Sequence, residues 1–161
     1  MSIFDKRVAF KPFEYPDVEK FTDAMDHSFW LVSHFNFDSD IHDYRTKLTP
    51  HERETIKRAM LAISQVEITI KRFWAKLGDR FPKAEFEQVG VTFGECEVRH
   101  ADAYSHLLQV LNLNDDFSSL LKVPAIQGRV DYLSKYLQNA NTNNDEDYQL
   151  TLTLFSIFIE N

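Results

Sequence analysis

Metal-ligand-type side chains interrupt the apolar faces of the helices that this 161-residue sequence predicts. They are Glu67 in one long segment, Glu97 and His100 in the next, and Glu160 in the last. Burying several charges in a helical core is costly unless a cation shares the site. Arginine and lysine do not occupy the same faces, so a pair of metal ions inside a helix bundle is the leading interpretation.

The composition fits a mostly helical globular domain. Glycine (4 residues) and proline (5 residues) are few, while 43% of the residues are hydrophobic and 14% are aromatic. A disordered chain lacks this apolar content. At this length we expect a single domain over residues 1–161, with residues 1–16 as an extended arm.

Charge, cysteine content and hydropathy exclude several classes of protein. The net charge of −7 provides no basic face for nucleic acid. No apolar run approaches the roughly 20 residues of a membrane span, so we expect no membrane partner. The single cysteine, Cys96, excludes an internal disulfide framework and fits a reducing, cytoplasmic compartment.

Apolar spacing predicts a short helix over residues 17–30, then a polar, irregular segment over 34–47. Thr49 is the expected N-cap of the first long helix, with Pro50 and Glu52 in its first turn. Its apolar residues recur at spacings of three and four and are Ile56, Met60, Ile63, Val66, Ile70, Phe73, Trp74 and Leu77. Glu67 lies among them, and Gly78 and Pro82 end the segment.

A second long helix is predicted from about Lys83. Its apolar face continues through Glu97, His100 and Tyr104, whereas Glu95, Arg99 and Asp102 are expected on a solvated surface. A third helical stretch follows Pro124, and a fourth begins near Asp145 and reaches Glu160. The predicted fold class is therefore all-α.

Glu97 and His100 stand three residues apart in the second long helix. Residues three apart share a helix face, so the two side chains can offer an oxygen and a nitrogen to one ion. Glu67 and Glu160 would supply carboxylates able to bridge two ions. Di-metal carboxylate bundles use one glutamate from each of two helices plus a Glu-x-x-His from each of the other two. This chain displays three of those four elements.

Each residue also has a simpler interpretation. Glu67 can be a charged residue at the edge of an apolar face, His100 a hydrogen-bonded core histidine, and Tyr104 an ordinary buried phenol. The combination on three helices favours a metal site. Cys96 is interpreted as a packing residue, and the remaining histidines as surface residues or neighbours of the site: His27, His34, His42, His51 and His106.

Four segments resemble the small, radical-generating (beta) subunit of class I ribonucleotide reductase. Its Glu-x-x-His helix, followed four residues later by the radical tyrosine, is similar to EVRHADAYSH, with Glu97, His100 and Tyr104. The preceding helix, which ends at the first metal ligand, is similar to LTPHERETIKRAMLAISQVE. The helix of the third carboxylate is similar to SIFIEN, and the segment of the electron-relay tryptophan, here Trp30, to YPDVEKFTDAMDHSFW.

The resemblance implies a ferritin-like helix bundle with a dinuclear metal centre that activates dioxygen. The implied ligands are Glu67, Glu97, His100 and Glu160, and Tyr104 would carry the tyrosyl radical. Trp30 would relay it to the large, catalytic subunit, where deoxyribonucleotides are made for DNA replication. Tyr104 favours iron, while the oxygen-rich ligand set also accepts manganese–iron or dimanganese. The family pairs as homodimers.

Three departures from the family pattern change these expectations. The family usually has aspartate at the position of Glu67, and it has a glutamate shortly after the relay tryptophan, where residues 31–34 differ. It also continues well beyond Glu160, where the second Glu-x-x-His, the carboxylate partner of the tryptophan and the docking tail lie. We therefore expect the N-terminal part of a small subunit, or one piece of a split one, inactive by itself.

Other functions remain open on the same pattern. A ligand-binding oxidase would use the metals without making a radical for a partner. A ferritin-like storage protein needs no electron relay, so Tyr104 and Trp30 argue against it. A metal-free helical interaction module is disfavoured by glutamates on three apolar faces.

Overall fold

A computed structural model describes residues 2–114, 119, 122–141 and 144–159, with the backbone alone at 67–69 and 139. In these ranges the regular elements are all helical, as the sequence predicts. The α-helices are α1 (Glu19–His27), α2 (Asp38–Thr46), α3 (Pro50–Ala75), α4 (Leu77–Arg80), α5 (Ala84–Val110), α7 (Pro124–Ala140) and α8 (Asp145–Leu154). Short 3-10 turns span Pro16–Val18 and Val32–His34, and a π-helical turn spans Phe155–Ile159.

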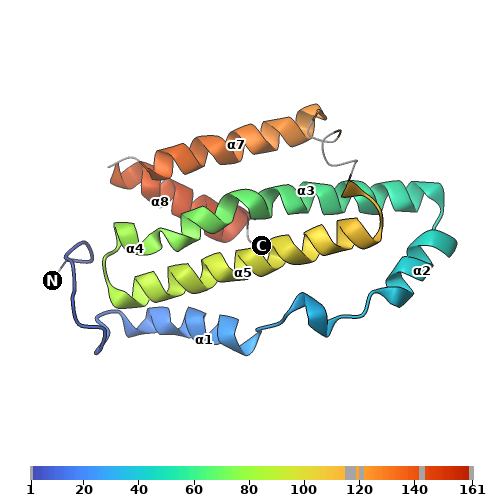
Figure 1. Ribbon diagram of the computed structural model, residues 1–161. Helices are drawn as coiled ribbons and strands as arrows, with labels where there is room; N and C mark the ends of the chain where they lie inside the picture. Colours follow the sequence, from blue (N-terminus) through green and yellow to red (C-terminus); the bar gives the residue numbers. More distant parts are fainter. Residues whose placement is uncertain (1, 115–118, 120–121, 142–143, 160–161) are drawn as a thin grey trace.

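Two long antiparallel helices, α3 and α5, form the centre of the molecule (Figure 1). Helix α1 packs along α5 on one side, and α7 and α8 lie against α3 on the other. The short helix α4 turns the chain between α3 and α5. Among the described residues, no helix has the length and apolar content needed to span a membrane.

The start of α3 follows the predicted capping pattern. The main-chain N–H of Glu52 donates to the Thr49 hydroxyl at 3.3 Å, and the main-chain N–H of Thr49 donates to the Glu52 carboxylate at 2.8 Å. Each residue thus satisfies a donor that the first helical turn leaves without a partner, and Pro50 occupies the position where no N–H is needed.

The main core is aromatic and lies where α3, α5, α7 and α8 meet. The Phe73 ring packs edge-on against Phe155 at 4.7 Å, and the Trp74 ring lies 4.8 Å from that of Phe93. Its buried residues are Val66, Ile70, Phe73, Trp74, Leu77, Val89, Leu133, Tyr148 and Phe155. A smaller cluster of Leu61, Leu108 and Leu113 closes the other end of the α3–α5 pair.

The expectation of an irregular segment over residues 34–47 is wrong. Helix α2 occupies most of it, and it begins where the Asn36 side chain accepts the main-chain N–H of Asp38 at 2.9 Å. None of its residues is buried, although Phe37, Ile41 and Tyr44 follow the spacing of four and three that predicts the other helices. This spacing and the acidic residues Asp38 and Asp40 in the first turn are the local signals of the helix.

The N-terminal arm is tied to the start of α5 by buried charges. Lys83 and Glu85 are each 1% exposed. The Lys83 ammonium lies 2.9 Å from the Glu14 carboxylate, and the Glu85 carboxylate accepts the main-chain N–H groups of Glu14 and Tyr15 at 2.9 and 2.7 Å. These contacts fix the arm against the start of α5. Oε1 of Glu85 accepts both main-chain N–H groups, whereas the buried Oε2 has no hydrogen-bond partner among the described residues.

Candidate functional site

Glu97 and His100 come together on α5, in the middle of the bundle. Glu97 is 1% exposed, and its Oε2 lies 3.2 Å from His100 Nδ1. A buried carboxylate beside an imidazole nitrogen, one helical turn apart, is a donor pair that suits a divalent metal ion. The burial of Glu97 is the observation that fits such an ion, because an isolated carboxylate is costly to remove from water.

Trp30 lies directly against the same histidine. Its ring stacks on the His100 ring with centroids 5.8 Å apart and planes 19° apart. The Phe35 ring packs edge-on against the Trp30 ring, with centroids 5.7 Å apart. The loop between α1 and α2 therefore brings a tryptophan that is distant in sequence into contact with the half-buried His100, beside the buried Glu97.

Arg99 holds this loop, which contradicts the expectation that Arg99 faces solvent. It is 8% exposed, and its Nε lies 2.9 Å from both carboxylate oxygens of Glu95. Its Nη1 donates to the main-chain oxygen of Trp30 at 3.2 Å, and its guanidinium lies over the Phe29 and Trp30 rings. The loop covers this side of α5, and helical spacing alone gives no sign of it.

The second nitrogen of His100 faces the only cysteine of the chain. Cys96 Sγ lies 3.7 Å from His100 Nε2, one turn earlier on α5. Cys96 is half-buried, and besides the packing role predicted for it, it contacts the imidazole of His100. Glu97, Cys96 and Trp30 thus surround the His100 ring.

Tyr104 is half-buried on α5, one turn beyond His100. At 100° per residue, its position differs from that of Glu97 by only about 20° around the helix. The tyrosine and the buried carboxylate therefore share one face of α5.

The other two predicted ligands are described less fully. Glu67 belongs to α3, whose backbone is described there, and Glu160 lies outside the described residues. Among the side chains that the structure describes, no group of three or more His, Cys, Asp and Glu residues is close enough to hold a metal ion. The four-residue ligand set therefore stays a prediction.

Backbone contacts nevertheless establish the register of α3 against α5. A Cβ at Gly90 would lie 2.6 Å from the Trp74 carbonyl oxygen, and a Cβ at Gly94 would lie 3.2 Å from that of Lys71. In antiparallel helices of equal rise, each step forward on α5 matches a step backward on α3. About one turn beyond the level of Gly94 and Lys71, Glu97 of α5 therefore lies level with residue 67 of α3. The backbones that carry Glu67 and Glu97 thus lie at the same height in the bundle.

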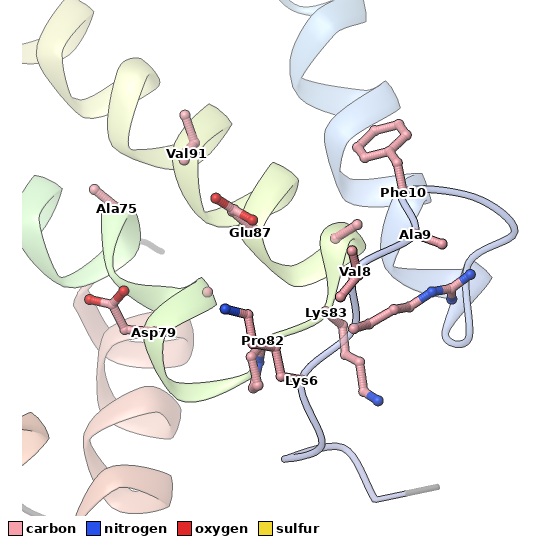
Figure 2. A pocket seen from close by; sticks show the side chains of 13 residues that line it. Lys6, Val8, Ala9, Phe10, Ala75, Asp79, Pro82, Lys83, Glu87 and Val91 are labelled. Carbon is pink, nitrogen blue, oxygen red and sulfur yellow. The ribbon is translucent and has the colours of Figure 1, made fainter.

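A separate cavity of about 510 Å³ opens between the arm and the corner formed by α3, α4 and α5. Figure 2 shows Lys6 and Val8 of the arm facing Asp79 and Glu87 across it. None of the predicted site residues lines this cavity. It is therefore distinct from the Glu97–His100 site.

Fold and site together define an all-α bundle with a carboxylate–histidine pair on its central helix. The family model for the small chain of ribonucleotide reductase matches residues 7–161. The chain therefore belongs to the family of ribonucleotide reductase small chains, which confirms the resemblance drawn from its motifs.

Two viral relatives match nearly the whole chain. One is the probable ribonucleoside-diphosphate reductase small subunit 048L of Invertebrate iridescent virus 3, 26% identical over 96% of this chain and 45% of the relative. The other is the probable small subunit 376L of Invertebrate iridescent virus 6, 24% identical over 99% of this chain and 48% of the relative. The chain spans about half the length of these curated relatives.

A solved structure confirms the fold. The R2 subunit of ribonucleotide reductase from Clostridium botulinum superposes with a TM-score of 0.80, covering 91% of this chain and 47% of that one. At 15% identity the match concerns the fold alone. The predicted ferritin-like helical architecture is thus confirmed.

Proposed function

We propose that this chain contributes to the radical-generating small subunit of ribonucleoside-diphosphate reductase. The observation that carries the proposal is the buried Glu97 carboxylate beside His100, with Trp30 stacked on the same imidazole. Membership in the small-chain family supports this function over a ferritin-like storage protein or a metal-free module.

In this proposal Glu67, Glu97, His100 and Glu160 are metal ligands. The shared height of residue 67 and Glu97 supports a site between α3 and α5. A bound dinuclear iron centre, or a manganese–iron or dimanganese one, would supply the oxidising chemistry with dioxygen. Glu97 and His100 would bind and orient the metal, and the surrounding helices would exclude water.

Tyr104 and Trp30 have separate roles in the proposal. Tyr104 shares the face of Glu97, and there its phenol would lose an electron and a proton to become the tyrosyl radical. Trp30 would carry the oxidising equivalent outward, since its ring contacts both His100 and the exposed Phe35. The large, catalytic subunit is the proposed recipient, and a homodimer is the proposed assembly.

Anaerobic titration with ferrous ion tests the metal site. We expect His100→Ala to weaken binding by at least about ten-fold, because even residues that only orient a metal ligand contribute that much. His106→Ala is the matched control, since His106 lies on the same helix and packs against Phe37 instead. Equal losses in the two variants would refute the assignment of His100.

Electron paramagnetic resonance separates the reductase from a ligand-binding oxidase on the same scaffold. The small subunit, assembled with the segments that its relatives carry beyond the matched region, should give a tyrosyl signal after loading in air. An oxidase would bind metal without that signal. Turnover of ribonucleotides with the large subunit then tests the proposed activity.

A further inference from the structure

Arg99 makes three contacts with the loop between α1 and α2, and a fourth contact, with Glu95, holds it on α5. Its Nε bonds the Glu95 carboxylate, and its Nη1 donates to the Trp30 main-chain oxygen. Its flat face lies 4.4 Å from the centroid of the Phe29 ring and 5.6 Å from that of Trp30. One side chain of α5 thus holds both the backbone and the ring of Trp30.

His100, which follows Arg99 in the sequence, also contacts Trp30. The Trp30 ring stacks on the His100 ring, so Arg99 and His100 meet Trp30 from successive positions of one helix. The loop exposes large apolar side chains, since Phe29, Leu31 and Phe35 are 51%, 42% and 53% exposed, and its ring contacts with the bundle run to His100 and His106 of α5. Its position must therefore depend on contacts with α5.

We propose that Arg99, held by Glu95, is a positioning residue that fixes Trp30 against His100. The placement is a property of the fold. Its use in electron transfer rests on the proposed function, in which Trp30 is the relay. A small change in the distance or tilt of the ring would then alter the transfer without removing any metal ligand.

Only arginine suits this position. The guanidinium offers N–H groups on more than one edge, so it bonds a carboxylate and a carbonyl at once, while its face remains free to stack on aromatic rings. A lysine ammonium is a compact charge that lacks this planar fork. Arg99→Lys should therefore keep the ion pair with Glu95 and still release Trp30.

Hydroxyl-radical footprinting read by mass spectrometry tests the placement on the metal-free protein. It reports the oxidation of Trp30 and of the buried Trp74 separately in one sample. In Arg99→Gln we expect Trp30 to oxidise about two-fold faster or more, because a half-buried ring becomes exposed by local opening. Trp74 should keep its rate, and the far-UV circular dichroism spectrum should be unchanged.

A similar ion pair on α3 provides the control. Arg58 Nε lies 2.8 Å from the Glu54 carboxylate at the same spacing of four residues, and it does not contact the loop. Arg58→Gln should leave Trp30 unchanged, while Arg99→Lys should resemble Arg99→Gln, and Glu95→Gln should show part of the effect. An unchanged Trp30 rate in folded Arg99→Gln, or full rescue by Arg99→Lys, would overturn the proposal.

The role of the placement in electron transfer is tested apart from the placement itself. In the assembled subunit with its large partner, Arg99→Gln should slow turnover while leaving ferrous ion binding unchanged, and Trp30→Phe should abolish turnover. If Trp30→Phe remains active, the relay function fails while the footprinting result stands. If Trp30 does not loosen in Arg99→Gln, the positioning role fails whatever Trp30→Phe does.

Discussion

At the scale of single residues, the surroundings of His100 distinguish the proposed metal ligands from the residues that only contact them. Glu97 is buried on α5, the half-buried His100 lies beside it, and Tyr104 follows on the face of Glu97. Cys96 and Trp30 contact the imidazole of His100 but are not themselves predicted metal ligands. Substitutions here should therefore divide into those that lose metal and those that change only the redox chemistry.

Tyr104→Phe belongs to the second kind. We expect it to abolish the tyrosyl radical and to leave metal affinity within about a few-fold, because the phenol is an electron donor and phenylalanine fills nearly the same volume. Metal analysis and electron paramagnetic resonance of the assembled subunit check both parts. A tyrosyl signal that survives in the variant would disprove the radical assignment, and a loss of metal would make Tyr104 a ligand.

Glu67→Ala, Glu97→Ala and His100→Ala belong to the first kind, and each should weaken ferrous ion binding strongly. Glu95→Ala should not, because Glu95 lies about 200° around the helix from Glu97 and bonds Arg99 instead. Calorimetric titration of the four variants decides between them. Equal weakening by Glu95→Ala and Glu97→Ala would mean that the helix is phased wrongly.

At the scale of elements, glycine governs how closely α5 approaches α3. A Cβ at Gly90 would lie 2.6 Å from the Trp74 carbonyl oxygen and 2.7 Å from the Leu77 Cβ. Both are part of the core of α3 or its continuation into α4, so neither can move aside cheaply. This close approach sets the separation of the two helices that carry Glu67 and Glu97.

We therefore expect Gly90→Ala to lower the free energy of unfolding by about 1–3 kcal/mol, as overpacking does, despite the better helix propensity of alanine. Urea denaturation measures it. Gly128→Ala on α7 is the control, because a Cβ there meets nothing within 4 Å and should stabilise the protein by up to about 1 kcal/mol. Gains in both variants would show that the helices do not pack this tightly.

The junction between the arm and α5 should respond to acid. Burial acts to raise the pKa of Glu85, but main-chain N–H groups of Glu85, Tyr15 and Glu14 and the charge of Arg7 lower it below its ordinary value. A carboxyl with a depressed folded-state pKa contributes stability above its unfolded pKa, and the contribution is lost as pH falls through the folded pKa.

The protection of the arm, residues 2–15, against hydrogen exchange, corrected for the intrinsic rate at each pH, should consequently fall as the pH is lowered through the folded-state pKa of Glu85. The protection of the middle of α5 should fall less. Glu85→Gln should lower the protection of the arm already at neutral pH, whereas Asp102→Asn, an exposed position of α5 that does not line the cavity beside the arm, should not. Arm exchange in Glu85→Gln that matches the parent protein would show that another contact holds the arm.

At the scale of the whole molecule, the 161 residues correspond to about half of the curated relatives. They carry three predicted carboxylate ligands and one histidine, whereas the di-metal bundle motif has four carboxylates and two histidines. Two large apolar side chains on the last described turn are also exposed, Ile157 at 53% and Phe158 at 69%. Exposed apolar surface of this kind favours association.

A polypeptide limited to these residues should bind ferrous ion weakly or at one site only, form no radical, and self-associate. Adding a fragment that corresponds to the remaining half of the relatives should reverse all three. Light scattering and metal analysis after loading in air test this directly. A monodisperse monomer that holds two ions and gives a tyrosyl signal would contradict the prediction.

The sequence by itself determined the features that depend on neighbours along the chain. The capping residues Thr49 and Glu52 and the apolar spacing after them are local, so the start and course of α3 could be predicted. Glu97 and His100 are three residues apart on one helix, so their meeting needs only helical geometry. The order of the motifs along the chain indicated the family, and the family model confirms it.

Only the tertiary structure decided which surfaces of those helices are covered. Arg99 and the Trp30 carbonyl that it bonds are 69 positions apart, and the apolar spacing of α5 puts Arg99 on a solvated face. The loop after α1 folds back on that face, buries the guanidinium and stacks Trp30 on His100. The apolar spacing of one helix indicates which of its faces is turned to the core and which is left for other contacts. Which distant segment excludes the water is settled by packing across the whole chain.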